Sequence, residues 1–238
     1  MLTVLSAEFT KLKRSYYFLV LFVISIFISI FGTLIASQDE FTTKGVLNQS
    51  VILINYMLGV PIFSIFTGLI FAKEYEQGTI SYLFTSSYKR IEFLLAKIVL
   101  IFCLISFMVI FTFVLSLIIG MIFSNETITL QETLPFVKIY LLTIAMQFAL
   151  TPLVILLTII WKNYIISIAL GIVAAFSIGI ITATPIGAYY PWSAPLLITY
   201  DFLGIVDMSI NIQIMGLLIL FVSTLLASLI CILNSEVK

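Results

Sequence analysis

Six stretches of this 238-residue chain are predominantly apolar over about 20 residues or more, and this pattern constrains the fold more than any other feature. Within lipid every backbone N–H and C=O group must be paired inside the protein, so spanning segments of this length form helices. The chain is 62% hydrophobic and 9% charged, which excludes an ordinary soluble domain. The sequence predicts an all-α polytopic membrane protein with spans at 16–36, 50–72, 98–123, 135–160, 164–184 and 210–233.

The Lys and Arg residues lie at alternate ends of these spans, which predicts the orientation of the chain. Of the 11 basic residues, all except Lys44 and Lys138 lie before the first span, in the second-to-third or fourth-to-fifth connections, or after the last span. Basic residues are retained on the cytoplasmic side of a membrane. We therefore expect residues 1–238 to form a single transmembrane domain in the plasma membrane, with both termini in the cytoplasm.

Residues 1–15, ahead of the first span, have the pattern of an amphipathic helix. Glu8, Lys11 and Arg14 fall mostly on one side of such a helix. A basic amphipathic helix lies along a membrane surface, so we expect an elbow helix that turns into the first span. The alternative is a basic flank that only sets the topology. The apolar side of the predicted helix carries Leu2, Leu5, Phe9, Leu12 and Tyr16.

The residue types that carry catalysis or ion coupling are missing from the predicted spans. The chain contains no His, the commonest general base and metal ligand, so we expect no catalytic residue and no metal site. No Asp, Glu, Lys or Arg lies near the middle of a span, which removes the usual proton or ion relay. The phosphate-binding sequence G-x-x-x-x-G-K-[ST] is also absent. We expect this chain to bind no cofactor itself, and any uphill transport to depend on a partner that supplies the energy.

Three polar residues lie deepest in the predicted spans: Asn55, Gln147 and Thr151. Polar side chains inside a membrane protein are costly and commonly line a substrate path, so we interpret these three as candidates for one. The formal net charge of the whole chain is zero, and no global field attracts nucleic acid. We expect the partners of this chain to be lipids and other proteins.

Small residues recur at every fourth position along the fifth span. Residues at this spacing stack on one helix face, and small side chains let a second helix approach closely. We expect a close helix contact, either within the chain or across the axis of a dimer. The small residues are Ser167, Gly171, Ala175, Gly179, Ala183 and Gly187.

Proline and aromatic residues mark irregular positions. Pro61 and Pro152 lie inside the second and fourth spans, where each should kink or break its helix. The outer segment 185–209 is rich in Tyr, Trp and Pro but is too interrupted to span the membrane. Two interpretations remain open for it: a re-entrant or interfacial cap, and a plain belt of aromatic residues at the lipid boundary.

A polar island at 73–97 separates the second and third spans, and it contains a moderately specific motif. The motif has the form E-x-E-x-G-T-[IL] and is followed by Lys89-Arg90 and by Leu95-Ala-Lys97. Together with the N-terminal Glu8-Phe-x-Lys11-x-x-Arg14 sequence and the six spans, it resembles the membrane subunits of ABC type-2 exporters. The likeness is greatest to the short permeases of bacitracin- and lantibiotic-immunity-like systems, and it covers nearly the whole chain.

The resemblance implies a coupling helix in the island that docks on a separate nucleotide-binding ATPase, which would hold ATP and Mg. It also implies a second permease subunit, identical or homologous, and an apolar or amphipathic substrate such as an antimicrobial peptide. The alternative function is an ATP-independent immunity or channel-like membrane protein. In the island, Gly78 suits a helix break, Thr79 a helix cap, and Tyr82 and Leu83 an apolar contact. The expected docking residues are Glu74, Glu76, Gly78, Thr79, Tyr82 and Leu83.

Overall fold

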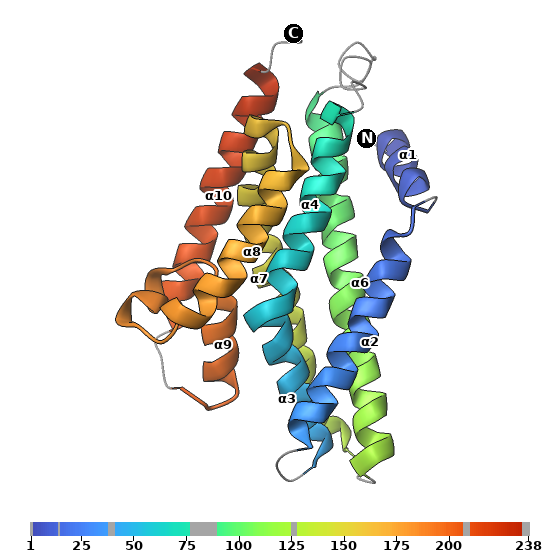
Figure 1. Ribbon diagram of the computed structural model, residues 1–238, viewed down its shortest axis with the longest axis vertical. Helices are drawn as coiled ribbons and strands as arrows, with labels where there is room; N and C mark the ends of the chain where they lie inside the picture. Colours follow the sequence, from blue (N-terminus) through green and yellow to red (C-terminus); the bar gives the residue numbers. More distant parts are fainter. Residues whose placement is uncertain are drawn as a thin grey trace.

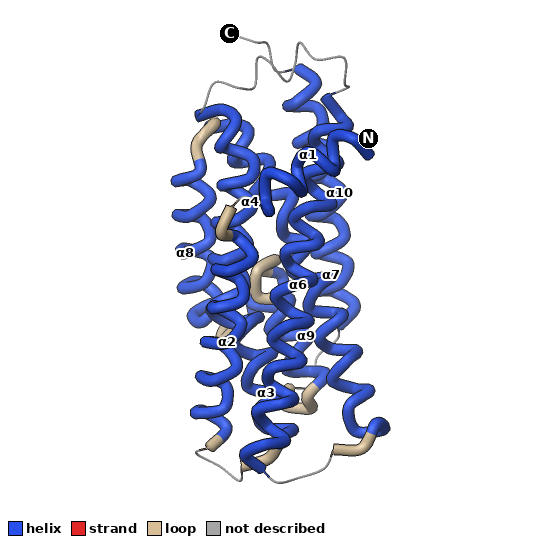
Figure 2. Tube along the Cα trace, turned by 90° about the vertical axis from the view of Figure 1, so that its right-hand side faces the viewer, coloured by secondary structure: helices blue, strands red, loops and turns tan. Residues whose placement is uncertain are grey.

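The computed structural model describes residues 2–13, 15–37, 41–76, 90–124, 128–206 and 210–234. These residues fold into helices and connecting loops, without a strand among them (Figure 2). Six helical segments of the described chain are long and apolar enough to cross a membrane. The predicted all-α polytopic fold with six spans is therefore confirmed. In chain order the helices are α1 (Leu2–Lys13), α2 (Tyr17–Ala36), α3 (Thr43–Leu53), η1 (Ile54–Leu58), α4 (Gly59–Glu76), α6 (Arg90–Ser124), α7 (Leu130–Trp161), α8 (Tyr164–Ile181), η2 (Pro185–Tyr189), α9 (Ala194–Phe202) and α10 (Ile210–Asn234).

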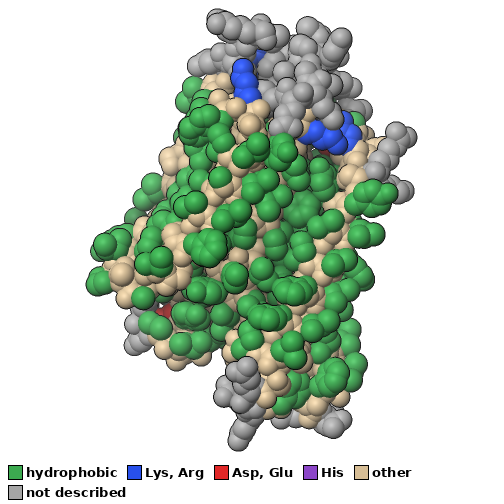
Figure 3. All heavy atoms as spheres, in the orientation of Figure 1, with side chains coloured by type: hydrophobic (Ala, Val, Ile, Leu, Met, Phe, Trp, Pro, Cys, Tyr) green, Lys and Arg blue, Asp and Glu red, His purple; other side chains and the backbone are tan. Residues whose placement is uncertain are grey.

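The spanning helices form an elongated bundle (Figures 1 and 2). α1 and the end of α10 lie at the same end, which we call the terminal end. The Lys and Arg side chains visible in Figure 3 gather there, and apolar side chains cover the length of the bundle. The second and fourth spans form its centre, with 61% of their most apolar stretch buried, against 17% for α10. An apolar outer surface of this kind is suited to contact with lipid.

The second span is one helix interrupted by a π-helical turn. Thr42 begins it by accepting a hydrogen bond from the Gly45 N–H at 3.1 Å. At η1 the Gly59 N–H donates to the Ile54 carbonyl, a π-type bond over five residues. A Cβ at Gly59 would lie 2.4 Å from that carbonyl oxygen, so the tight turn requires glycine. Pro61, two residues after Gly59, cannot donate to the carbonyl four residues earlier, and this favours such a break.

The fourth span, α7, runs through Pro152 as one helix. Pro152 has no N–H to donate to the Phe148 carbonyl. The Thr151 hydroxyl donates to that carbonyl instead, at 2.8 Å. The hydrogen bond from Thr151 keeps the Phe148 carbonyl paired inside the membrane, where an unpaired carbonyl group is costly.

The elbow segment packs differently from the expected pattern. α1 lies against α6, and its buried residues are Val4, Glu8 and Leu12, which are four residues apart. Glu8 was expected on the polar side but is 6% exposed, and Tyr16 was expected on the apolar side but is 78% exposed. The Lys11 ammonium lies 2.5 Å from the Glu8 carboxylate, and this ion pair allows the burial.

The outer segment folds back against the bundle. α9 packs on η1, α3, α7 and α10, and residues 194–199 are buried. A hydrogen bond between the Ser177 and Tyr190 hydroxyls, 2.6 Å long, ties the stretch between η2 and α9 to α8. The segment therefore contributes side chains to the interior, and the most important of these is Thr199.

Candidate functional site

A buried cluster of neutral polar side chains surrounds the π-helical turn of the second span. Asn55 lies in η1 and Gln147 on α7, and the Gln147 Nε2 donates to the Asn55 Oδ1 at 2.9 Å. The Asn55 Nδ2 donates to the Thr143 Oγ1 at 3.0 Å and to the Thr199 Oγ1 at 2.9 Å. All four side chains are at most 2% exposed. We call these four residues the amide cluster.

The amide cluster joins the second span, the fourth span and the outer segment through hydrogen bonds. The Thr199 hydroxyl donates to the Pro195 carbonyl at 2.7 Å, so its oxygen is free to accept from Asn55. Both Asn55 Nδ2 protons and its carbonyl oxygen are used, which leaves this buried amide fully paired. Moving α9 away from the second span would break the Asn55–Thr199 bond, and a buried polar group left unpaired costs about 1–3 kcal/mol.

Sequence reasoning found two of the four residues in this cluster. Asn55 and Gln147 contact each other, whereas the Thr151 hydroxyl donates to a carbonyl of its own helix, and a substrate path along these three residues stays a prediction. Thr143 could have been found, because Thr143, Gln147 and Thr151 are four residues apart and share one face of α7. Nothing in the local sequence of Thr199 indicates that it meets Asn55, which is far away in the chain.

A cavity of about 10 Å³ lies beside Gln147 and has room for about one water molecule. Ser64, Thr151 and Trp192 are among the residues that line it. The Trp192 Nε1 is buried and has no hydrogen-bond partner within the described part of the chain. A space of this size beside Gln147 has no room for a solute larger than water.

The small residues of the fifth span pack against the second span of the same chain. A Cβ at Gly171 would lie 2.8 Å from the Pro61 Cα, and one at Gly68 would lie 2.4 Å from the Ser167 Cβ. Farther along α8, Gly179 faces the Tyr56 hydroxyl, and Ala175 lines an apolar groove beside Tyr56. The first part of this series therefore makes a close contact within the chain.

The last two members of the series do not continue this helix face. α8 ends at Ile181, so Ala183 lies in the following turn and is exposed. Gly187 lies in η2, where a Cβ would meet the Ile181 carbonyl oxygen at 2.7 Å. The expectation of six stacked residues is wrong for Ala183 and Gly187, because the helix stops before the four-residue spacing reaches them.

Lys97, expected in a polar connection, is instead buried inside the bundle. α6 begins at Arg90 rather than near residue 98, so Lys97 lies two turns inside this helix and is 3% exposed. The Lys97 Nζ donates to the Ile70 carbonyl of α4 at 2.6 Å and lies 5.3 Å from the centre of the Phe71 ring. Both groups offer negative potential to the ammonium, which accounts for the burial.

The expected docking residues lie outside the residues whose side chains are described. α4 includes Glu74 and Glu76 in its last turn. The remaining docking residues, at 78–83, fall between the described ranges 41–76 and 90–124. Docking at all six positions therefore stays a prediction.

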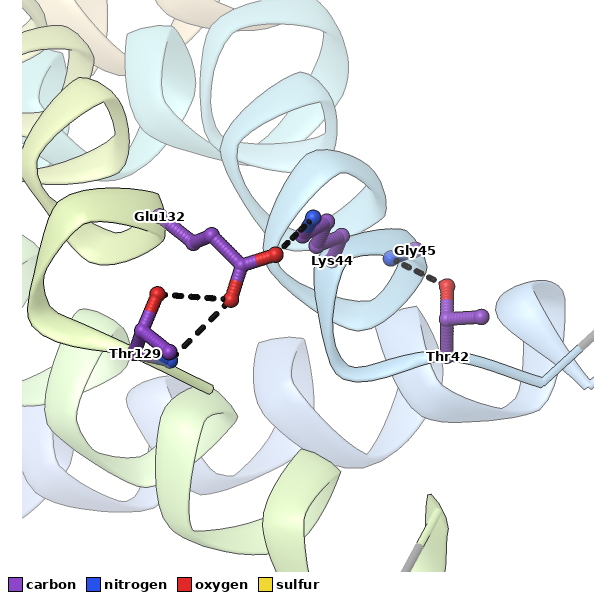
Figure 4. Close-up of polar contacts among 5 residues, drawn as sticks. All are labelled: Thr42, Lys44, Gly45, Thr129 and Glu132. Atoms are coloured by element: carbon purple, nitrogen blue, oxygen red, sulfur yellow. Dashed lines mark hydrogen bonds and ion pairs between the residues drawn. The ribbon is translucent and has the colours of Figure 1, made fainter. Parts of the chain in front are cut away.

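The end of the bundle opposite the termini carries an exposed ion pair (Figure 4). α7 has 32 residues, and at about 1.5 Å per residue it is about 48 Å long, so its first turn extends beyond a hydrocarbon core of about 30 Å. There the Lys44 Nζ lies 2.6 Å from the Glu132 Oε1, and Thr129 donates its N–H and its hydroxyl to the Oε2. The hydrogen bond from Lys44, followed by those from Thr129, lowers the pKa of Glu132 to about 2.

The described residues contain no group of three or more His, Cys, Asp or Glu side chains placed to hold a metal ion. Among the described residues, the buried polar side chains are amides and hydroxyls together with Lys97 and Glu8. These can form and exchange hydrogen bonds, and they are suited to guiding or gating a solute.

Comparison with known proteins gives a consistent result. Residues 4–178 match the model of a family described as ABC-2 family transporter protein. The chain is also 28% identical over 138 residues to the bacitracin transport permease protein BCRB of Bacillus licheniformis. This alignment covers 58% of the chain and 66% of the length of that relative. The resemblance that the sequence motifs indicated is confirmed, and the chain belongs to the ABC-2 transporter family.

Proposed function

We propose that this chain is the permease subunit of an ATP-driven exporter, in which a separate subunit hydrolyses ATP. The observation that carries the proposal is the family match over residues 4–178, nearly three quarters of the chain. Six helices are long and apolar enough to cross a membrane, and the cluster at their centre is made of neutral polar side chains, which suits a transport subunit. A second permease subunit, identical or homologous, would complete the membrane part of the complex.

The substrate that fits best is a hydrophobic or amphipathic molecule such as an antimicrobial peptide. The amide cluster offers neutral hydrogen-bonding groups without charge. A substrate with an apolar side and a polar side could exchange hydrogen bonds with this cluster while its apolar side stays in lipid or against the helices. The relative named for bacitracin transport supports the same class of substrate.

The basic end of the bundle supports one orientation of the chain in the membrane. The terminal end carries Arg90 and Lys97, and the opposite end carries the Lys44–Glu132 pair. The excess of basic residues at the terminal end supports a cytoplasmic location for both termini. Single cysteines at Glu126 and Gln77, in a variant without Cys103 and Cys231, test this. A membrane-impermeant reagent should label position 126 in intact cells and position 77 only after permeabilisation, and the reverse result would overturn the proposed topology.

The connection between α4 and α6 would dock the ATPase and transmit its movement. The double variant Glu74→Ala, Glu76→Ala should insert normally, because acidic residues contribute little to topology. It should nevertheless lose the ATPase from the purified complex, or lose stimulation of ATP hydrolysis by bacitracin as the first probe peptide. Double replacement of the exposed Asn211 and Ser223 by Ala is the matched control and should keep both properties.

The second candidate is a membrane protein that protects the cell or conducts solutes without ATP. It would retain full activity in the Glu74→Ala, Glu76→Ala variant and in cells that lack the ATPase subunit. Retained protection under both conditions would refute the exporter proposal. The family match favours the exporter, because ABC transporters are defined by their use of an ATPase.

A further inference from the structure

The buried ammonium of Lys97 is held by a site that α4 provides. A lysine is almost never fully buried unless its charge is paired. Here Nζ donates to the Ile70 carbonyl at 2.6 Å and faces the Phe71 ring at 5.3 Å. Both contacts come from consecutive residues of one helix. Lys97 is therefore a direct link from α6 to α4.

The position of this link in the chain is unusual. Ile70 lies near the end of α4, and Lys97 lies near the start of α6, so the two residues stand on either side of the polar connection. α4 packs mainly on α8 and α7 and contacts α6 over few residues. Ile70 and Phe71 of α4 share one buried apolar cluster with Leu94 and Ile98 of α6, and Lys97 adds to it a directional polar contact between the two helices.

A second basic residue of α6 makes a similar contact with another helix. The Arg90 Nη1 donates to the Ile232 carbonyl at 3.3 Å and to the Leu233 carbonyl at 3.2 Å, in the last turns of α10. Cations are favoured near helix C-termini, where carbonyl groups lack partners within the helix. The first turns of α6 thus hold the ends of two neighbouring helices through basic side chains.

We propose that Lys97 is a positioning residue that ties α4 to α6, so that both helices move as one unit when an ATPase acts on the connection between them. This inference rests on the proposed function. α4 continues through η1 to Asn55, so a movement of its terminal end reaches the amide cluster along one continuous helix. Without the tie, α4 and α6 would respond separately and the movement would be dissipated.

Lys97→Met is the variant that removes the tie with the least disturbance. Methionine has a similar length and volume to lysine but no ammonium. Methionine fills the space of the lysine side chain and adds no polar group that would need a partner, so the variant should fold and insert. Lys97→Arg keeps a buried cation with several donors and should restore the tie at least in part. Lys162→Met, at an exposed lysine between α7 and α8, is the matched control.

The first measurement tests the tie without any partner protein. Spin labels are placed at the exposed positions Lys73 and Ile91 of the full chain in lipid nanodiscs, with Cys103 and Cys231 replaced by serine. Pulsed electron resonance should give a narrow distance distribution for the otherwise native chain and for Lys162→Met. Lys97→Met should broaden it about twofold, and Lys97→Arg should narrow it again. An unchanged width in Lys97→Met would overturn the tie.

The second measurement tests the role of the tie in the complex with the ATPase. Lys97→Met should keep basal ATP hydrolysis, but the stimulation of hydrolysis by bacitracin should fall about tenfold. Lys162→Met should keep both the basal rate and the stimulation. Full stimulation in a Lys97→Met complex with a broadened distribution would overturn the positioning role. If the native chain binds no ATPase, the proposed function fails, while the distance measurement still decides whether Lys97 ties the two helices.

Discussion

The bundle contains two sets of polar contacts, and they differ in charge as well as in depth. Around η1 the contacts join neutral groups, with Asn55 and Gln147 at the centre. Near the terminal end the contacts use basic side chains of α6, Lys97 and Arg90, and their acceptors are backbone carbonyls of neighbouring helices. Both sets are buried or partly buried, so burial alone does not explain which kind of group is used.

Depth in the membrane explains the difference. A charge at the centre of a spanning helix costs about 2.5–3.5 kcal/mol on insertion scales, and the cost falls toward the ends. The acceptors of Arg90 lie in the last turn of α10, where carbonyl groups lack partners within the helix. In the middle of the bundle, an amide surrounded by hydroxyls satisfies its own hydrogen bonds without net charge. In these two sets of contacts, the kind of polar group therefore changes with its position along the bundle.

The largest expected effect comes from forcing α8 away from the second span. In Gly171→Leu the new side chain would collide with the Pro61 backbone, which cannot rotate away. We expect a loss of about 3 kcal/mol, at the upper end of the usual range for overpacking. Thermal unfolding in detergent, monitored by size-exclusion chromatography, measures this.

Two further variants are expected to lose less stability than Gly171→Leu. Gly179→Leu should be milder, because its neighbour is the hydroxyl end of the Tyr56 side chain, which can move. Gly216→Leu should have almost no effect, because nothing lies within 4 Å of a Cβ at that position of α10. Equal stability of Gly171→Leu and Gly216→Leu would show that the α4–α8 contact is not close.

The second prediction concerns the loss of the neutral hydrogen bonds in the amide cluster. Asn55→Leu removes the central amide and leaves Gln147 without its acceptor inside the bundle. We expect a loss of about 2 kcal/mol, within the range for a buried polar group left unpaired, and weaker attachment of α9 through Thr199. The midpoint of thermal unfolding and the proteolysis rate of the outer segment measure the two effects. Asn211→Leu, at an exposed position, is the control and should change neither.

The sequence predicts those parts of this fold that depend on the length of apolar runs. Six spans and the all-α class follow from that length, because lipid requires a helix to pair its own backbone. A close helix contact at Gly171 also follows from local spacing, although the spacing left open whether the partner helix belongs to the same chain. These features need no knowledge of how distant segments meet.

The remaining features depend on distant contacts, which local patterns do not encode. Lys97 is a charged residue of the kind expected in an exposed loop, yet a carbonyl of α4 makes its burial possible. Glu8 lies on the packed face of α1 because α6 is there and Lys11 pairs with it. Thr199 enters the amide cluster because the outer segment folds back to Asn55. Each of these positions is decided by the partner and not by the neighbouring residues.

The third prediction compares two buried threonines that differ in one respect. The Thr143 hydroxyl accepts a hydrogen bond from Asn55, whereas the Thr67 hydroxyl on α4 is buried with no partner in the described structure. Thr143→Val should lower stability by about 1 kcal/mol, a typical net value for one hydrogen bond. Thr67→Val removes an unpaired hydroxyl at nearly constant shape and should leave stability unchanged or raise it slightly. A larger loss for Thr67→Val than for Thr143→Val would contradict the assigned hydrogen bonds.

The smallest expected effect concerns the exposed pair at the end opposite the termini, where water screens the charges. Because Lys44 and Thr129 lower the pKa of Glu132 to about 2, below the ordinary glutamate value of about 4.3, pairing stabilises the fold in full above the ordinary value. The contribution fades as the pH falls toward the lowered pKa, since the protonated carboxyl no longer attracts Lys44. Glu132→Gln should therefore lower the unfolding midpoint slightly at neutral pH, and the difference from the native chain should shrink as the pH falls below about 4. Added salt at neutral pH should reduce the same difference, because exposed charges are screened. A difference that is independent of pH and of salt would show that Glu132 acts through the hydrogen bonds of its helix cap and not through its charge.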